Sequence, residues 1–540
     1  MRSEADTAAE RAAAQEQGGA WSPLRLELFR ALWLAALVSN VGTWMQNVAA
    51  VWYMTSLTPS PLMVALVQAA TSLPVFLVGL PAGAVADIVD RRRLLLWTQG
   101  WMLAVAAALA VLTFAGLMTG WLLLALTFAL GLGMAMNAPS WQAITPEIVP
   151  VPELPRAIAL NALTVNIGRA VGPALGGFLV AAAGPAVVFI LNAASFVAVL
   201  VVVYRWRRAP TTSILPAERL FAATRAGLRY ARHAPALASV LIRTALFMLA
   251  ASAFWALLPV IARSELGMDA IGYGVLLACV GGGATAGAAL LPRVKKRLSA
   301  DGLTALATGV FAVVSVLTAL WRWVPGLWLV MVIGGLAWIA MMATLNSAAQ
   351  TTVPSWVRAR ALGVYLVVFQ GGLGLGSALW GAVAERIGTS LALALAGVAL
   401  VAGLAAIPRW RLGVTVDLTP SAHWPEPHVV AAPSLDSGPV YVQVEYRVDS
   451  MQAREFLAVV SELGGVRRRD GALAWSVYRD PADLERYVEI FLVESWVEHL
   501  RQHDRVTQAD RTLEERVRRF HRGGSPPVVT HLVAGSAGTP

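Results

Sequence analysis

The chain is poor in charge and almost free of cysteine. Only 14% of its 540 residues are charged and 57% are hydrophobic, whereas soluble proteins carry close to a quarter charged residues. The charge is also unevenly placed, because residues 430–540 hold 30 of the 74 charged residues. The first 429 residues therefore have the composition of a polytopic membrane domain, which excludes a soluble enzyme, a fibrous protein and a disordered chain.

Further absences exclude several kinds of site. A single cysteine, Cys279, within an apolar run excludes a disulfide framework and a cysteine-based metal site. There is no glycine-rich phosphate loop and no compact basic patch with interleaved aromatic residues, so we expect no cofactor and no nucleic-acid partner. Residues 1–19 lack the apolar core of a signal peptide, and we expect them to form a cytoplasmic tail.

Twelve apolar stretches are each long enough to cross a hydrocarbon core of about 30 Å as a helix. The even-numbered connections between them hold 17 Lys and Arg residues and the odd-numbered ones only three. This asymmetry predicts a multi-pass protein with its even-numbered connections and both termini in the cytoplasm. The expected spans are 30–54, 62–86, 94–115, 121–140, 157–183, 186–204, 237–261, 271–291, 302–319, 326–345, 361–384 and 390–408.

The two halves of this region match at a constant offset of 204 residues. Arg91–Arg93 correspond to Lys295–Arg297, and glycines at 168, 172 and 177 correspond to glycines at 372, 376 and 381. Two parallel six-helix repeats are typical of the major facilitator fold, whose transport path runs between the halves. Between the halves, Pro216–Ala234 combines arginines with apolar residues and predicts a helix at the cytoplasmic membrane surface, or equally a solvated linker helix.

The composition changes after Arg411. A proline-rich linker precedes strand-like and helix-like segments in the order strand–helix–strand–strand–helix, which predicts a small cytoplasmic α+β domain with a ferredoxin-like fold. The fold class is therefore an all-α membrane protein of twelve helices with this added domain. The expected segments are a cytoplasmic tail (1–28), an N-terminal half (29–205), a cytoplasmic central loop (206–235), a C-terminal half (236–410), a linker (411–439), the α+β domain (440–525) and a tail (526–540).

Two motifs in the N-terminal half carry functional expectations. Gly83, Asp87 and Arg91, Arg92 and Arg93 surround the second connection, where an acid beside basic residues can form a latch that breaks between states. We expect a cytoplasmic gate there, although the arginines alone would also serve topology. In the fifth span, small residues at every fourth position and a helix-bending proline predict a flat packing face. Its residues are Gly168, Gly172, Pro173, Gly176 and Gly177.

Polar residues inside the spans are the candidates for a substrate cavity. Arg169 lies deep in the fifth span, where an unpaired charge is costly and marks a functional site by default. We expect it to bind an anionic or oxygen-rich substrate, and the alternative is that it bonds carbonyls freed by the Pro173 bend. Helix–helix hydrogen bonding is the alternative for the amides. The other cavity candidates are Asn40, Gln46, Asn47, Asn137, Asn161, Asn166 and Gln370.

These motifs resemble those of the drug:proton antiporter group of the major facilitator superfamily, which includes enterobactin exporters and macrolide-efflux proteins. The fifth-span motif matches that group's pattern at every fixed position, whereas Ile88 and Asp90 depart from its loop pattern. The added C-terminal domain is typical of the subgroup called transmembrane secretion effectors. Other matching segments are Ser39–Gln46, Pro139–Gln142, Pro146–Glu147 and Ala159–Asn161.

The resemblance implies an exporter of a drug-like, macrolide or siderophore-type molecule that works by alternating access in the bacterial inner membrane. It also implies coupling to protons, yet no carboxylate lies deep in any span, and Asp87 is the best available candidate. An importer remains the alternative within transport. A membrane-anchored enzyme or a sensor acting through the C-terminal domain are alternatives of other classes.

The C-terminal segment is similar to the antibiotic-biosynthesis monooxygenase family of dimeric α+β barrels. We expect this domain to regulate the transporter or to dimerise it. His499 and His503 have the four-residue spacing of two metal ligands on one helix face, but no third ligand is evident. A solvated, charged helix face explains the pair better, and we expect no metal site.

Overall fold

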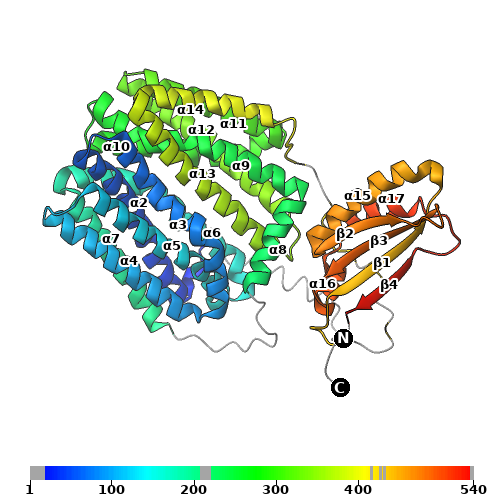
Figure 1. Ribbon diagram of the computed structural model, residues 1–540. Coiled ribbons are helices and arrows are strands. Elements are labelled where there is room, and N and C mark those ends of the chain that lie inside the picture. Colours follow the sequence, from blue (N-terminus) through cyan, green and yellow to red (C-terminus); the bar gives the residue numbers. More distant parts are fainter. Residues whose placement is uncertain are drawn as a thin grey trace. The chain divides into compact units, whose positions relative to one another are not determined.

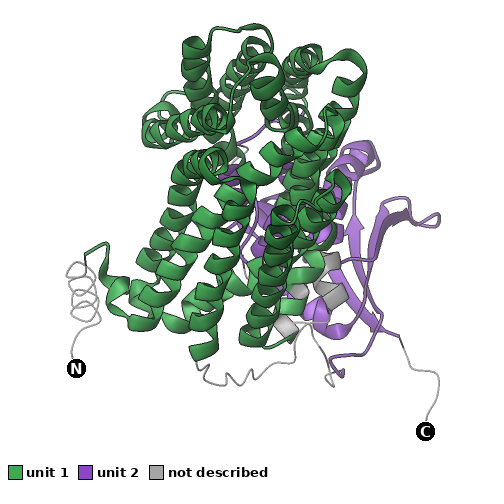
Figure 2. Ribbon diagram, turned by 90° about the vertical axis from the view of Figure 1, so that its left-hand side faces the viewer, with its two compact units in different colours: residues 1–220, 243–345, 365–409 green, residues 221–242, 346–364, 410–540 purple. Residues whose placement is uncertain are grey.

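A computed structural model describes residues 19–206, 220–413, 417–421, 423–424, 429 and 433–534. The chain forms two compact units, coloured separately in Figure 2. Unit 1 comprises residues 1–220, 243–345 and 365–409, and unit 2 comprises residues 221–242, 346–364 and 410–540. Unit 1 thus holds most of the membrane helices, whereas unit 2 joins the C-terminal domain to the central-loop helix and to the connection between two membrane helices.

Twelve helices in the described chain are long and apolar enough to cross a membrane, which confirms the predicted number. Each overlaps its expected span (Figure 1). They are α2 (Glu27–Leu57), α3 (Pro61–Ile88), α4 (Arg91–Phe114), α5 (Gly120–Ile148), α6 (Leu154–Ala183), α7 (Pro185–Arg205), α9 (Pro235–Val260), α10 (Ala270–Lys295), α11 (Ala300–Leu320), α12 (Val324–Thr351), α13 (Arg358–Ile387) and α14 (Thr389–Gly403). The shorter helix α8 (Leu220–His233) lies in the central loop, and α9 continues into a π-helical turn, η3 (Ile261–Glu265).

The helix ends follow from local chemistry. Side chains with an oxygen acceptor cap free backbone N–H groups at several helix starts; Asp90, for example, accepts a hydrogen bond of 2.9 Å from the backbone N–H of Arg93 and so begins α4. Gly184 and Gly388 take positive φ angles of +81° and +88° in the turns after α6 and α13. These two glycines are 204 residues apart, so the repeat found in the sequence extends to the turns.

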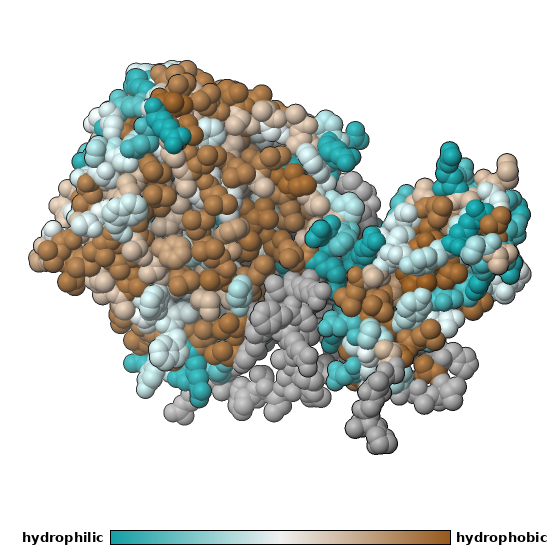
Figure 3. Space-filling model, viewed as in Figure 1, coloured by the Kyte–Doolittle hydropathy of each residue, from teal (hydrophilic) through white to brown (hydrophobic). Residues whose placement is uncertain are grey.

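The repeat also governs helix packing within unit 1. A Cβ atom on Gly172 would lie 2.5 Å from the Cβ of Trp44 on α2, and one on Gly376 would lie 2.6 Å from the carbonyl oxygen of Leu249 on α9. Equivalent glycines therefore let α6 and α13 approach equivalent helices. Large apolar side chains such as Phe114, 84% exposed, and Leu329, 63% exposed, cover the outside, and brown apolar residues dominate the helical face in Figure 3, as for a surface in contact with lipid.

The C-terminal domain in unit 2 has the predicted ferredoxin-like topology. Its antiparallel sheet has the strand order β2-β3-β1-β4, with helices inserted as in a βαββαβ fold. Alternate residues of β1 and β3 are buried, and α15 contributes Phe456, Val460 and Leu463 to the core. The elements are β1 (Val440–Arg447), α15 (Ala453–Asp470), β2 (Ala474–Arg479), β3 (Arg486–Val493), α16 (Trp496–Arg505), α17 (Gln508–Arg518) and β4 (Val528–Val533).

Three expectations about this region need correction. The domain does not end at residue 525, because β4 lies within the predicted tail and pairs with β1. The predicted single helix after Trp496 is two helices, since the Thr507 side chain and Asp510 form a capping box that starts α17 anew. The predicted linker is partly fixed on the domain: Pro420 bridges to Thr507, and the Ser421 N–H donates to the Val506 carbonyl at 2.8 Å.

Candidate functional site

The fifth-span motif lies on α6 and contacts helices from both halves of the transporter. A Cβ on Gly168 would lie 3.0 Å from the backbone of Asn40, and one on Gly176 would lie 2.9 Å from the Cα of Met45, so these glycines pack against α2. Gly177 instead faces α10, where an added Cβ would lie only 2.4 Å from the carbonyl oxygen of Ala270. The predicted flat face therefore serves close packing within the N-terminal half and across the boundary between the halves.

Arg169 lies halfway along α6 beside this face. Its guanidinium carbon is 5.5 Å from the centre of the Trp44 ring on α2, a cation–π arrangement. The absent side chain of Gly172 leaves the space that Trp44 occupies. On the other side, a Cβ built on Gly281 of α10 would lie 3.5 Å from the carbonyl oxygen of Arg169, which places Arg169 at the boundary between the halves.

No acid neutralises Arg169 among the described residues, and its buried Nε has no hydrogen-bond partner there. In particular, the side chain reaches none of the backbone carbonyls around Pro173, which the packing alternative requires. The only other arginine deep in a span, Arg243 on α9, differs in this respect. It is paired with Asp301 and Thr304 of α11, so its charge is balanced within the protein.

Four of the amide candidates are used in packing between helices of the N-terminal half. The Asn40 amide donates to Thr164 at 3.3 Å, and Asn161 donates to Thr145 at 2.9 Å. Asn137 bonds to Thr98 and Gln99 of α4. Gln46 bonds to Asn192 of α7. Gln46 is 2% exposed. These contacts are the helix–helix bonding that was the alternative to a cavity role, and Asn192 was not anticipated.

Asn47, Asn166 and Gln370 differ from those four amides. They are half-buried or exposed, and within the described residues their side chains make no hydrogen bond. Among the predicted cavity residues, these three and Arg169 are the ones whose side chains make no hydrogen bond to another described residue. They remain candidates for substrate contact.

The second connection is built differently from a free basic loop. Arg91 forms a 2.6 Å ion pair with Glu147 at the end of α5, and Arg92 donates to the Tyr204 carbonyl at the end of α7 at 2.6 Å. These arginines therefore tie three helix ends of the N-terminal half together in addition to any role in topology. The side chain of Asp87 lies outside the described residues. The sequence analysis names Glu147 only within a matching segment and does not connect it with Arg91, because nothing in the spacing of the two residues links them.

Hydrogen bonds between the halves lie at the odd-numbered connections. Arg263 of η3 donates to Thr55 of α2 at 3.0 Å and lies 5.4 Å from the Trp52 ring, which stacks on Tyr273 of α10. Glu385 of α13 accepts hydrogen bonds from the Ser60 hydroxyl at 2.8 Å and the Leu62 N–H at 3.2 Å, at the start of α3. These hydrogen bonds hold the two halves together at this end.

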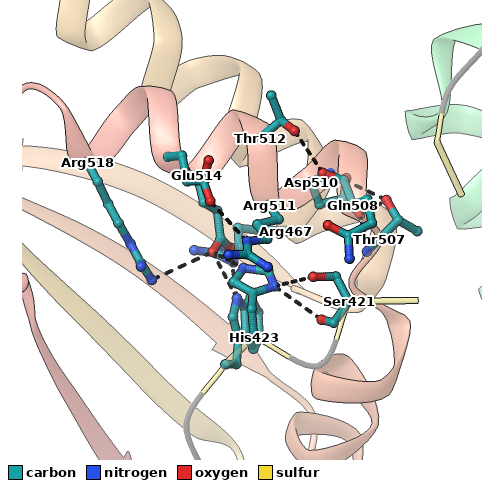
Figure 4. Close-up of polar contacts among 12 residues, drawn as sticks. Ser421, His423, Arg467, Thr507, Gln508, Asp510, Arg511, Thr512, Glu514 and Arg518 are labelled. Carbon is teal, nitrogen blue, oxygen red and sulfur yellow. Dashed lines mark hydrogen bonds and ion pairs between the residues drawn. The ribbon is translucent and has the colours of Figure 1, made fainter. Parts of the chain in front are cut away.

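The C-terminal domain contains a buried cluster of charged side chains. Arg467 of α15 is 6% exposed and pairs with Glu489 of β3 at 3.2 Å and Glu514 of α17 at 2.8 Å. His423 from the fixed linker segment also donates to Glu514 (Figure 4). The neighbouring Trp424 donates to the same carboxylate. Burial alone would raise the pKa of Glu514, but the Arg467 charge and these hydrogen bonds lower it to about 2.

The two histidines singled out by their spacing do not form a solvated helix face, which corrects that expectation. His499 is 1% exposed and packs against His503 at a ring distance of 5.1 Å, and His531 from β4 lies 4.8 Å away. Burial, followed by the nearby His531 and His503, lowers the pKa of His499 to about 3. Among the described residues, no group of three or more His, Cys, Asp or Glu side chains is arranged to hold a metal ion.

The sequence of this chain matches one family model and several known proteins. A family model described as transmembrane secretion effector matches residues 18–539, including the C-terminal domain. The enterobactin exporter of Salmonella typhimurium is 27% identical over 391 residues, covering 69% of this chain and 89% of that protein. Macrolide efflux protein A of Streptococcus pyogenes is 23% identical over 151 residues, covering 28% of this chain and 37% of that protein.

Solved structures with the same arrangement of helices are also transporters. A bacterial homologue of the human lysosomal transporter Spinster, in an inward-facing conformation, has a TM-score of 0.54 at 16% identity and covers 72% of this chain and 95% of that chain. A POT family transporter bound to a peptide conjugate has a TM-score of 0.58 at 13% identity, covering 71% and 95%. At these identities the likeness establishes the major facilitator fold and nothing finer.

Proposed function

Because the chain belongs to the transmembrane secretion effector family, it is a secondary transporter that exports a small molecule across the bacterial inner membrane, and we propose that its substrate is an anionic or oxygen-rich compound of siderophore or macrolide type. It is a transporter and not an enzyme. The enterobactin exporter and the macrolide efflux protein among its relatives support this substrate range.

The observation that carries the substrate proposal is Arg169. It is a positive charge halfway along a membrane helix, at the boundary between the halves, where transporters of this fold bind their substrates. It has no acid partner in the described residues, and Trp44 provides an aromatic surface beside it. A carboxylate, catecholate or hydroxyl-rich ligand would satisfy the unused guanidinium donors, and its apolar part would pack on the indole ring.

Transport by Arg169 variants tests this substrate class. We expect Arg169→Ala to lower export of an accepted compound at least about tenfold, because a hydrogen bond to a charged group is worth ~1.5–3 kcal/mol. Arg169→Lys keeps the charge and should retain part of the activity. Arg386→Ala, at an exposed arginine on α13, is the matched control. Intracellular accumulation of macrolides, dyes and catecholate siderophores provides the measurement, and equal export by all variants would refute the charge role.

The described state has its odd-numbered connections closed. With those connections on the periplasmic side, as the distribution of Lys and Arg predicts, this state of an alternating-access cycle is closed toward the periplasm. The halves must then separate at the Arg263–Thr55 and Glu385–Ser60 contacts to release substrate outward. Both termini lie in the cytoplasm under this orientation, which a cysteine-accessibility map of the connections would test.

Export is driven by the proton gradient, with Asp87 as the coupling group. The carboxylates of the described spans lie near the helix ends and none lies deep in a span, and Asp87 lies in the last turn of α3; both observations support this assignment. A protonophore should raise the intracellular concentration of substrate in cells with the wild-type protein. Asp87→Asn should give the same high concentration without the protonophore. Export that survives both treatments would rule out proton coupling.

The C-terminal domain also dimerises the transporter. One face of its sheet is covered by helices, whereas on the other face Val488, Ile490 and Leu492 of β3 are only half-buried, which leaves apolar surface for a second copy. Light scattering on the purified full-length protein should give the mass of a dimer. Ile490→Arg should convert it to a monomer, and a wild-type monomer would exclude this arrangement.

A further inference from the structure

Unit 2 contains a row of stacked charged and aromatic side chains that the transport site does not use. Arg469 of α15 lies 5.7 Å from the Tyr230 ring of α8. Tyr230 meets Trp356, in the connection between α12 and α13, edge to face at 5.9 Å. Arg505 of α16 lies 4.5 Å from the Trp356 ring. The row therefore links the C-terminal domain to the central-loop helix and to a connection between two membrane helices.

Both arginines are held in position from within the domain. Arg505 is 6% exposed and bonds to Glu498 and to the Asp470 carbonyl, each at 2.6 Å. Arg469 bonds to Asp470 at 2.8 Å and to Asp510 at 2.7 Å. Because these partners fix the guanidinium planes before they meet the aromatic rings, little side-chain entropy is lost when the contact forms.

The aromatic residues depend on the same contact. Tyr230 is 2% exposed, and its hydroxyl points to the Thr352 carbonyl at 3.4 Å. The indole Nε1 of Trp356 is buried and has no hydrogen-bond partner in the described chain, so the ring is held by stacking. Arg229 of α8 adds a 3.4 Å ion pair to Glu498. Hence the end of α8 that carries Arg229 and Tyr230 is bound to the C-terminal domain.

We propose that the C-terminal domain is a clamp that holds α8 and the α12–α13 connection together and thereby favours the state that is closed toward the periplasm. Trp356 lies two residues before α13, and α13 continues from unit 2 into unit 1. The far end of α13 carries Glu385, which holds the start of α3 in the closed periplasmic contact. The clamp therefore restrains one end of a helix whose other end closes the transporter.

A contact of this kind shifts a conformational equilibrium only if it is stronger in one state than in the other. A cation–π contact made in a single state is worth roughly a two- to thirtyfold change in the ratio of the two states. With the clamp intact, the state closed toward the periplasm is favoured, and release of the clamp frees α13 for outward opening. The proposal concerns the conformational cycle and does not depend on the substrate class.

Distances between spin labels at Ser56 and Ser264 test the clamp in the full-length protein. These exposed residues lie on the two halves beside the periplasmic contact, and Cys279→Ala removes the one native cysteine. We expect Trp356→Leu and Tyr230→Leu each to raise the ratio of open to closed populations at least about fivefold. Trp328→Leu, at an exposed tryptophan of α12, is the matched control and should leave the ratio unchanged.

Arg505→Lys covers the case in which an aromatic variant fails to fold. It keeps the charge beside Glu498 but removes the planar group that stacks on Trp356, so the ratio should rise by a smaller factor. An unchanged ratio in the folded clamp variants would overturn the proposal. Loss of export by Arg169→Ala with a normal distance distribution would separate substrate binding from the clamp, so that the two proposals fail independently.

Discussion

Gly177 provides a sharp test of how the two halves of the transporter close. A Cβ at this position would lie 2.4 Å from the carbonyl oxygen of Ala270 and 3.1 Å from the Cα of Gly274. Ordinary contact begins near 3.4 Å, so Gly177→Ala requires α6 and α10 to separate by about 1 Å. Both obstructing atoms belong to the backbone, so no change of side-chain rotamer can relieve the clash.

Overpacking of this kind costs ~1–3 kcal/mol, which corresponds to a five- to 150-fold loss in the ratio of closed to open states. We expect Gly177→Ala to increase the open population between labels at Ser56 and Ser264 and to reduce export. Gly282→Ala is the control, because a Cβ there meets nothing within 4 Å and it reproduces the gain in helix propensity. If both variants give the same ratio, glycine at position 177 is not needed for closure, and the packing argument fails.

Three further predictions concern charge. The folded-state pKa of each clustered histidine, such as His499, lies below the ordinary 6.5, so the unfolded chain takes up protons first as the pH falls through 6.5. Domain stability should therefore drop between pH 7.5 and 5.5 by up to ~1.4 kcal/mol per pH unit for each histidine, with a smaller drop in His499→Leu. If the opening free energies of β1 and β3 amides, obtained from hydrogen exchange in the intact protein after correction for the intrinsic exchange rate, do not change with pH, this prediction is contradicted. Arg467→Met should destabilise the domain by ~3–5 kcal/mol, because Glu489 and Glu514 are left buried without their partner; unchanged exchange would disprove it. Glu385→Gln should raise the open population about two- to fivefold by removing a charge from the start of α3, and a spin-label distribution identical to wild type would refute this.

The membrane fold was predictable because its signals are long and redundant. Twelve apolar stretches, the Lys and Arg asymmetry and the offset of 204 residues all agree, and each rests on many residues. The ferredoxin-like domain was recognisable from its alternating strands, but β4 was missed because its residues Val528–Val533 follow two prolines and alternate weakly, with burial that comes only from pairing with β1. Thr507 likewise marks a helix break only through its capping box with Asp510.

The sequence names candidate site residues, but it does not show which of them already bond to a neighbouring helix. Asn137 and Asn161 have the same composition signal as Asn47, yet they bond to α4 and α5, and a one-dimensional pattern cannot distinguish an amide that faces a neighbour from one that faces a cavity. Glu385 was passed over because an acid at a helix end looks like an ordinary loop residue. Only the contact between α13 and α3 shows that Glu385 caps the start of α3.

The internal repeat offers a way to separate scaffold from function within the fifth-span motif. Gly168, Gly172 and Gly177 have glycine counterparts 204 residues later, and those counterparts pack against equivalent helices. Such residues are required by the fold in both halves. Arg169 corresponds to Leu373 in the second half, so the fold itself does not require an arginine there. A costly charge that the scaffold does not need, and that no acid among the described residues balances, is best explained by what passes between the halves.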